Sequence, residues 1–89
     1  MAFDDVNPQA PVHVLVIPRI HVESLQGFQT SETNLMGALL QCCREVAQLK
    51  GVSDLGYRVV ANTGSSAGQT VFHMHFHVLG GRSFAWPPG

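Results

Sequence analysis

The chain has 89 residues, of which only 12% are charged, and five Lys and Arg against six Asp and Glu give a net charge of −1. This length predicts one domain over residues 1–89 with a modest core. The charge balance argues against nucleic acid as a main partner, because such binding uses many cationic contacts to phosphate, but it is compatible with one small anionic ligand. No apolar stretch reaches the length of a membrane span and no signal peptide is recognisable, so we expect a cytoplasmic protein.

The N-terminal third is predicted to hold one strand between irregular segments. Residues 1–11 are rich in Asp, Asn and Pro, which favour turns. Residues 12–18, VHVLVIP, are β-branched and almost wholly apolar, and they predict a buried strand that ends at Pro18. The residues that follow predict a loop with one helical turn at 21–26.

Residues 31–50 carry the clearest helix signal. Ser31 can cap the N-terminus, Glu32 lies in the first turn, where a negative charge suits the helix dipole, and Gly51 fits a left-handed stop. Apolar residues recur at three- and four-residue steps in two neighbouring stripes, Leu35, Leu39, Cys42, Val46 and Leu49 in one and Met36, Leu40, Cys43 and Ala47 in the other. So wide an apolar face predicts a helix that is covered on two sides. The adjacent cysteines on it predict reduced packing thiols, since a bond between neighbours would be strained.

The C-terminal half is predicted to add two strands. Residues 56–62, GYRVVAN, predict a second strand, and residues 63–69, TGSSAGQ, predict a loop rich in Gly and Ser. Residues 70–81 predict a third strand. The segment that follows ends in WPPG, whose prolines cannot continue regular structure.

The third predicted strand carries the chemically informative residues His73, His75 and His77. Alternate residues of a strand share a face, so three imidazoles are predicted to line one side while apolar neighbours pack on the other. Imidazoles fill a core poorly, which favours a face that opens onto a ligand. Neutral imidazole can attack phosphorus, and a second imidazole can stabilise the charge that develops. The preceding Gly-rich loop can bring main-chain amides close to a phosphate.

Two alternative interpretations of these histidines stay open at this point. They could be exposed residues without a role, or ligands of a metal ion, since His-x-His on a strand can present two ligands to zinc. A metal site would require all three rings to converge, or His13 or His21 to join them. The two cysteines lie on the helix stripes and favour core packing over metal binding.

The run HMHFHVL, residues 73–79, resembles the signature of the histidine triad (HIT) superfamily. The resemblance extends to FDDVNPQAPVHVLVIPR, GYRVVANTG, GQTVFHMHFHVLGGR and the terminal WPPG, which together cover nearly the whole chain. The VLGGR and WPPG segments are similar to the histidine triad nucleotide-binding (HINT) branch. The resemblance implies an α+β fold with an antiparallel sheet and one long helix, in which the N-terminal helix and strand of other members are missing.

By this resemblance His75 corresponds to the nucleophile, which forms a nucleotidyl-imidazole intermediate that water then hydrolyses. His77 corresponds to the residue that contacts the phosphate oxygens, and His73 to a residue that fixes the orientation of the nucleophile. Thr70 stands where many members have serine. Its hydroxyl can still hydrogen-bond the leaving nitrogen, and its methyl group is expected to slow turnover. No metal or other cofactor is implied.

The resemblance also implies a pocket for a purine nucleotide. Its members are Phe3 and Val6 at the base, Asp5 at the ribose hydroxyls, Asn62, Gly68 and Gln69 at the phosphate and ribose, His13 near the site, and Trp86 reaching the site of a partner subunit. Three have a structural alternative, namely core packing for Phe3 and His13 and turn formation for Asp5. The implied assembly is a homodimer built through the helix and the C-terminal segment.

We therefore expect a metal-independent hydrolase that cleaves the phosphorus–nitrogen bond of purine nucleoside phosphoramidates, or a mixed acyl-nucleotide anhydride, and releases a nucleoside monophosphate. The alternative is a purine nucleotide-binding module with little or no turnover, which Thr70 and the missing N-terminal segment both favour. A third hypothesis is a metal-binding or scaffolding protein, and it predicts that chelators alter stability.

Overall fold

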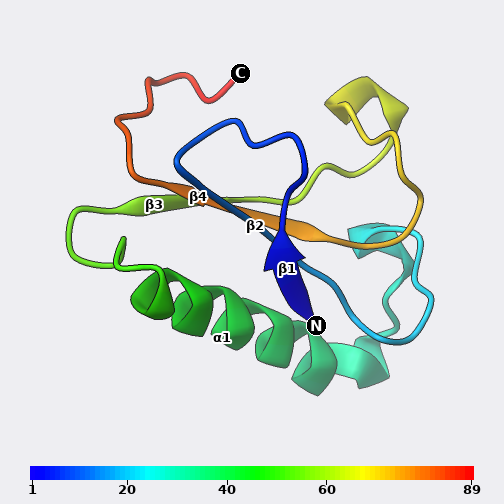
Figure 1. Ribbon diagram of the computed structural model, residues 1–89. Coiled ribbons are helices and arrows are strands. Elements are labelled where there is room, and N and C mark those ends of the chain that lie inside the picture. Colours follow the sequence, from blue (N-terminus) through cyan, green and yellow to red (C-terminus); the bar gives the residue numbers. More distant parts are fainter.

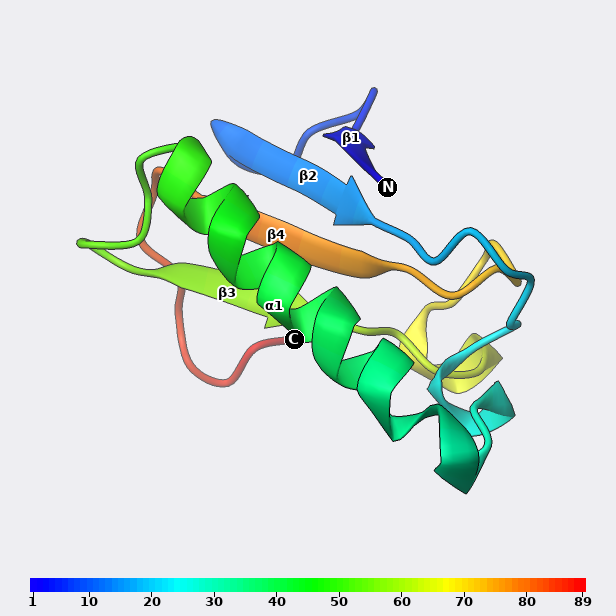
Figure 2. The same ribbon diagram turned by 90° about the horizontal axis from the view of Figure 1, so that it is seen from below.

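A computed structural model describes residues 1–89 as one four-stranded antiparallel sheet with a single long helix packed on one face (Figures 1 and 2). The strands are β1 (Ala2–Asp4), β2 (Val12–Val16), β3 (Tyr57–Val60) and β4 (Phe76–Gly80), and the helix is α1 (Thr33–Leu49). Their order across the sheet is β1-β2-β4-β3. Single 3₁₀ turns lie at Leu25–Gly27, Thr30–Glu32 and Ser65–Ala67. This is the predicted α+β arrangement.

The first strand is absent from the sequence prediction, which gave only turns to residues 1–11. Ala2 pairs with Val16 and Phe3 with Leu15, so β1 extends the sheet at its edge. All three side chains of β1 are exposed, and their residue types carry no alternating pattern. The prediction was wrong here because pairing with the free edge of β2 decides the conformation, and local propensity does not.

The predicted strand over residues 70–81 was too long, because β4 begins only at Phe76. The neighbours of β4 explain where it starts. Its pairing with β2 begins at Val16 and its pairing with β3 begins at Val60, so residues 70–75 have no strand on either side. Beyond Val16, Pro18 lacks the N–H that a longer ladder needs. For similar reasons β2 and β3 are shorter than the predicted 12–18 and 56–62.

Helix α1 begins at Thr33, after the 3₁₀ turn, so Ser31 lies outside it and does not cap it. Instead, the Glu32 carboxylate accepts a hydrogen bond of 2.7 Å from the N–H of Gln29. The helix ends where predicted, since Gly51 has a φ of +73°. The buried residues of the helix come from both predicted stripes and are Leu39, Cys43, Val46 and Ala47. Burial raises the pKa of the Cys43 thiol to about 11, which suits a packing residue.

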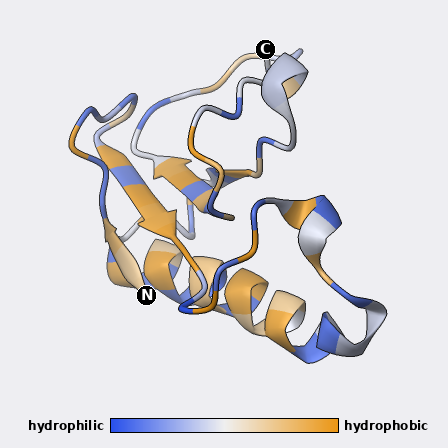
Figure 3. Ribbon diagram, turned by 90° about the vertical axis from the view of Figure 1, so that its right-hand side faces the viewer, coloured by the Kyte–Doolittle hydropathy of each residue, from blue (hydrophilic) through white to orange (hydrophobic).

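The core lies between α1 and the sheet. Val14 and Val16 of β2 and Phe76 and Val78 of β4 point into it. In the hydropathy colouring the strands are largely hydrophobic and are broken by hydrophilic positions (Figure 3). Side chains alternate along a strand, so the intervening residues of β2 and β4 lie on the face that α1 does not cover. No helix has the length and apolar character that crossing a membrane requires.

Candidate active site

The uncovered face of the sheet carries a row of side chains that crosses all four strands. Phe3 pairs with Leu15, Leu15 with His77, and His77 with Val60. Directly paired residues of antiparallel strands point to the same face. His77 therefore sits in the middle of the sheet between apolar neighbours, and Phe3 lies two strands away at the edge.

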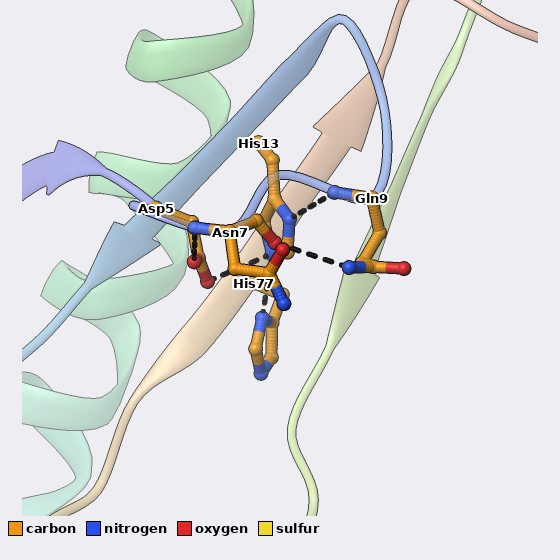
Figure 4. A network of polar contacts seen from close by, with 5 residues as sticks. All are labelled: Asp5, Asn7, Gln9, His13 and His77. Atoms are coloured by element: carbon orange, nitrogen blue, oxygen red, sulfur yellow. Dashed lines mark hydrogen bonds and ion pairs between the residues drawn. The ribbon is translucent and has the colours of Figure 1, made fainter.

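A polar network joins His77 to the N-terminal segment (Figure 4). His13 Nε2 lies 2.8 Å from His77 Nδ1 and 3.5 Å from an oxygen of the Asp5 carboxylate. The N–H of Gln9 donates a hydrogen bond of 3.0 Å to His13 Nδ1. The other oxygen of the Asp5 carboxylate accepts a hydrogen bond from the N–H of Asn7. Only 6% of His13 is exposed, so the imidazole at the centre of this network is shielded from water.

This environment favours the neutral form of His77. Burial lowers the pKa of His77 below the usual value of 6.5, and positive charge on His75 or His13 lowers it further. The Asp5 carboxylate acts in the opposite direction and does not reverse the shift. A neutral imidazole keeps one donor and one acceptor nitrogen. His77 can therefore hydrogen-bond a ligand without carrying a charge.

His75 is oriented by the main chain. Its Nδ1 lies 2.7 Å from the carbonyl oxygen of His73, and because a carbonyl only accepts, Nδ1 carries the proton. The neutral ring then has its lone pair on Nε2. The ring centroid is 5.1 Å from that of His77. The site therefore holds an imidazole nitrogen with a free lone pair beside a second imidazole.

The side chain of His73 takes a different direction. Its Nε2 donates to the carbonyl oxygen of Pro18 at 3.2 Å, and its Nδ1 is 3.4 Å from Nδ1 of His21. The prediction of three imidazoles in one row along a strand was therefore wrong, because β4 begins only at Phe76, after His73 and His75. Met74, Phe76 and Val78 are buried as the alternation predicted. His73 contacts His75 through its main-chain carbonyl group.

The loop before the triad is held by a buried glutamine. The Gln69 side chain accepts a hydrogen bond of 2.8 Å from the Gly64 N–H and donates to the carbonyl oxygens of Glu23 and Val71. Gly64 and Gly68 both have positive φ, at +86° and +88°, which glycine adopts readily. The Gln69 side chain thus fixes the loop, and its contact with a nucleotide stays a prediction.

The other predicted site residues are partly or wholly exposed. Gly68 and Thr70 are exposed and Asn62 is half-buried. Val6 is 100% exposed and Trp86 84% exposed, so neither packs on the rest of the chain. Their roles at the base and at a partner's site stay predictions. The sequence analysis missed Gln9, which acts through its main chain, and considered His21 only as a possible metal ligand.

Asp5, His13 and His77 are the residues that could hold a metal ion, since one ligand atom from each lies within 4.8 Å of the others. The donor set suits zinc. The 2.8 Å between His13 Nε2 and His77 Nδ1 is a hydrogen-bond distance. Two nitrogens on a tetrahedral zinc ion would be about 3.3 Å apart. The residues as placed fit a hydrogen-bonded pair better than a metal site.

A surface cavity of about 610 Å³ lies elsewhere. It is lined by residues at the end of α1, the start of β3 and the C-terminal segment, including Leu55, Tyr57, Arg58, Arg82 and Phe84. None of its lining residues is a histidine or a carboxylate. We therefore assign the chemistry to the histidine cluster and not to this cavity.

Comparison with known proteins gives the family whose model the chain matches. A model of the HIT domain matches residues 1–84. An uncharacterised HIT-like protein of Synechocystis is 52% identical over 89 residues, which are 100% of this chain and 77% of that protein. A 14 kDa zinc-binding protein of Zea mays is 47% identical over 92 residues, covering 100% of this chain and 70% of that protein.

Solved structures show the same fold. A HIT family hydrolase from Legionella pneumophila has a TM-score of 0.96 and 43% identity, over 99% of this chain and 79% of that one. A histidine triad protein from Clostridium difficile has a TM-score of 0.90 and 38% identity, over 94% of this chain and 73% of that one. Each of these proteins is longer than the region it shares with this chain.

Proposed function

The chain belongs to the HIT domain family, and from this premise we propose that it hydrolyses the phosphorus–nitrogen bond of purine nucleoside phosphoramidates through a nucleotidyl-His75 intermediate. The observation that carries the proposal is the hydrogen bond from His75 Nδ1 to the His73 carbonyl oxygen, which leaves a lone pair on Nε2. Assignment to the nucleotide-binding branch of the family is part of the proposal.

In the first step His75 Nε2 attacks phosphorus. A bond forms between Nε2 and phosphorus, the bond from phosphorus to the amine nitrogen breaks, and the leaving amine takes up one proton from solvent water. The Thr70 hydroxyl hydrogen-bonds the leaving nitrogen and relays that proton by giving its own proton to the nitrogen and receiving one from water. The imidazole becomes positively charged as it gives up its lone pair, and the hydrogen bond of 2.7 Å to the His73 carbonyl stabilises this charge.

His77 stabilises the phosphoryl oxygens during this step, because its ring centroid lies 5.1 Å from that of His75 and it offers a ring N–H. The main-chain N–H groups of Ala67, Gly68 and Gln69 in the neighbouring loop already donate to carbonyl oxygens of that loop, so they are not donors to the phosphate. Donors that are already in position need no reorganisation when charge develops, which makes such stabilisation large. In the second step water attacks phosphorus, the bond to Nε2 breaks, and one proton of that water returns to the solvent, which balances the proton taken up in the first step. The nucleoside monophosphate and neutral His75 are released.

The nucleotide is proposed to lie across the open face of the sheet. The base packs near Phe3 and Val6, and the Asp5 carboxylate accepts hydrogen bonds from the ribose hydroxyls. Asn62 and Gln69 lie nearest the phosphate and ribose. A partner subunit contributes Trp86, and the homodimer covers the outer side of α1, where Leu40 is 53% exposed.

The test is release of amine from a fluorogenic adenosine phosphoramidate in the presence of EDTA, for the unmodified chain and for His75→Ala. We expect turnover that survives chelation and disappears in the variant. A folded chain that binds AMP without turnover would support the binding module instead. Turnover or stability that is lost on chelation would support a metal role, in line with the name of the Zea mays relative.

A further inference from the structure

We infer that the main-chain N–H of Gln9 fixes which nitrogens of His13 and His77 carry protons, so that His77 presents an N–H at Nε2, and that Arg82 is the positioning residue that holds Gln9. The tautomers follow from hydrogen bonds alone. Their consequence for catalysis rests on the proposed function.

The tautomer of His13 is set by its main-chain neighbour. A main-chain N–H can only donate, so the hydrogen bond of 3.0 Å from Gln9 requires a lone pair on His13 Nδ1. Neutral His13 then carries its proton on Nε2. Because His13 is only 6% exposed, no bulk water is available to support the other tautomer.

The tautomer of His77 follows from that of His13. The proton on His13 Nε2 has two acceptors, His77 Nδ1 at 2.8 Å and an oxygen of Asp5 at 3.5 Å. The shorter contact is a hydrogen bond, and the longer one adds electrostatic attraction. If His77 also carried its proton on Nδ1, two N–H groups would face each other at 2.8 Å. Neutral His77 therefore keeps its proton on Nε2.

With its proton on Nε2, His77 becomes a hydrogen-bond donor that points in one direction. The Nε2 end of His77 points away from the network formed with His13 and Asp5 (Figure 4). A ring that presents N–H at this end can donate to a phosphoryl oxygen. Burial lowers the pKa of His77, so this donation does not depend on a cationic ring. An imidazole without this constraint would have to select the donor tautomer when the ligand binds.

Arg82 holds Gln9, whose N–H determines the tautomers of His13 and His77. Its Nε donates a hydrogen bond of 3.0 Å to the Gln9 carbonyl oxygen, so both main-chain groups of Gln9 are engaged. The Arg82 guanidinium lies 4.2 Å from the centroid of the Phe84 ring, and that of Arg58 lies 5.0 Å from it. Arg58 also donates to the carbonyl oxygen of Ala85. The segment after β4 is thereby tied to the segment that carries Gln9.

The direct test is ¹⁵N NMR of the histidine ring nitrogens in the unmodified chain at neutral pH with EDTA present. We expect the chemical shift of an unprotonated nitrogen at His13 Nδ1 and at His77 Nδ1, and that of a protonated nitrogen at both Nε2 atoms. A proton found mainly on His13 Nδ1 or His77 Nδ1 would overturn the inference. This readout needs no substrate, so it can fail while the proposed hydrolysis holds, or succeed while hydrolysis is absent.

A matched pair of variants separates the main-chain donor from the Gln9 side chain. Gln9→Pro removes the N–H, whereas Gln9→Ala keeps it. We expect Gln9→Pro to give mixed tautomers at His13 and His77 and to weaken AMP binding about tenfold, and Gln9→Ala to do neither. The ¹⁵N shifts of His75 serve as the internal check that Gln9→Pro has folded, because the proton on His75 Nδ1 depends on the His73 carbonyl and not on Gln9. Equal behaviour of the two variants would contradict the inference.

Arg82→Ala provides an independent variant if Gln9→Pro does not fold. We expect it to raise the population of the second His13 tautomer and to lower kcat by a few fold, with KM for the phosphoramidate changed less. Arg82→Lys keeps the charge but has no Nε–H in the same place, and should behave like Arg82→Ala. Unchanged ring shifts in both arginine variants would exclude Arg82 as a positioning residue.

Discussion

The two ends of the histidine-rich segment differ in how their imidazole pairs are held. At one end His13 and His77 are paired at 2.8 Å on the sheet, and a main-chain donor fixes their protons. At the other end His21 and His73 are 3.4 Å apart, outside any strand, and His21 is exposed. His75 lies between them. The alternating sequence pattern therefore does not give the three histidines the same surroundings, because only His77 lies in a strand of the sheet.

Substitution of His75, between the two pairs, should have the largest effect. His75→Ala removes the imidazole whose Nδ1 proton is held by the His73 carbonyl and whose Nε2 therefore carries a lone pair. We expect kcat to fall by about 10⁴-fold or more, which is typical for loss of a nucleophile. Stopped or continuous assays with the fluorogenic phosphoramidate measure this, and binding of AMP within a few fold of the unmodified chain is the control. Residual activity above about one tenth would exclude His75 as the nucleophile.

His77, at the end that the sheet supports, should give the next largest effect. His77→Ala removes the donor at Nε2 and leaves the proton of His13 without its near acceptor. We expect kcat to fall about 10²- to 10³-fold, the usual loss for one oxyanion donor. His77→Gln places an amide N–H nearby and should recover part of this. Equal losses for both variants would indicate that His77 acts through its ring charge and not through donation.

The lowered pKa of His77 also makes stability depend on pH. In the unfolded chain the ring gains a proton near its ordinary value of 6.5, whereas in the folded chain it resists until lower pH. The folded state then binds fewer protons, so its stability falls as pH drops below 6.5. We expect urea unfolding of the unmodified chain to lose more stability from about pH 7 to about pH 5 than His77→Gln does. If stability fell equally with pH in both proteins, the lowered pKa of His77 would be contradicted.

His73, at the end outside the strands, should give the smallest effect on chemistry. His73→Ala removes the contacts with His21 and Pro18 but keeps the carbonyl that orients His75. We expect kcat to change by less than about tenfold, and the free energy of unfolding to fall by about 1 kcal/mol for the lost hydrogen bond. Chemical denaturation and the amine-release assay measure both. A loss of kcat as large as that of His77→Ala would mean that the His73 ring itself supports the site.

Much of the architecture could be predicted from local signals. The apolar repeat at three- and four-residue steps, together with Gly51, correctly predicted the helix. The alternation around His75 correctly predicted that Met74 and Phe76 are buried and that the histidines alternating with them are not. Where elements end could not be predicted in the same way. β4 starts at Phe76 because its neighbours end there, which is a property of the paired strands and not of one segment.

The polar network was the least predictable part. His13 and His77 are 64 residues apart in the chain, and the donor that fixes them is a main-chain N–H, which any residue except proline has. Residue type therefore carries no sign of the role of Gln9. The resemblance gave His13 a place near the site, and the structure supplies its partners. Likewise, the His73 carbonyl acts on His75 through the backbone, which the side-chain pattern does not reveal.

The covalent role of His75 is tested most directly by the stereochemistry at phosphorus. A single diastereomer of an adenosine phosphorothioamidate, hydrolysed in ¹⁸O-labelled water, gives a chiral product whose configuration can be read by phosphorus NMR. Attack by His75 followed by attack by water inverts phosphorus twice, so we predict net retention. Net inversion would show that water attacks phosphorus directly and would contradict the nucleotidyl-His75 intermediate.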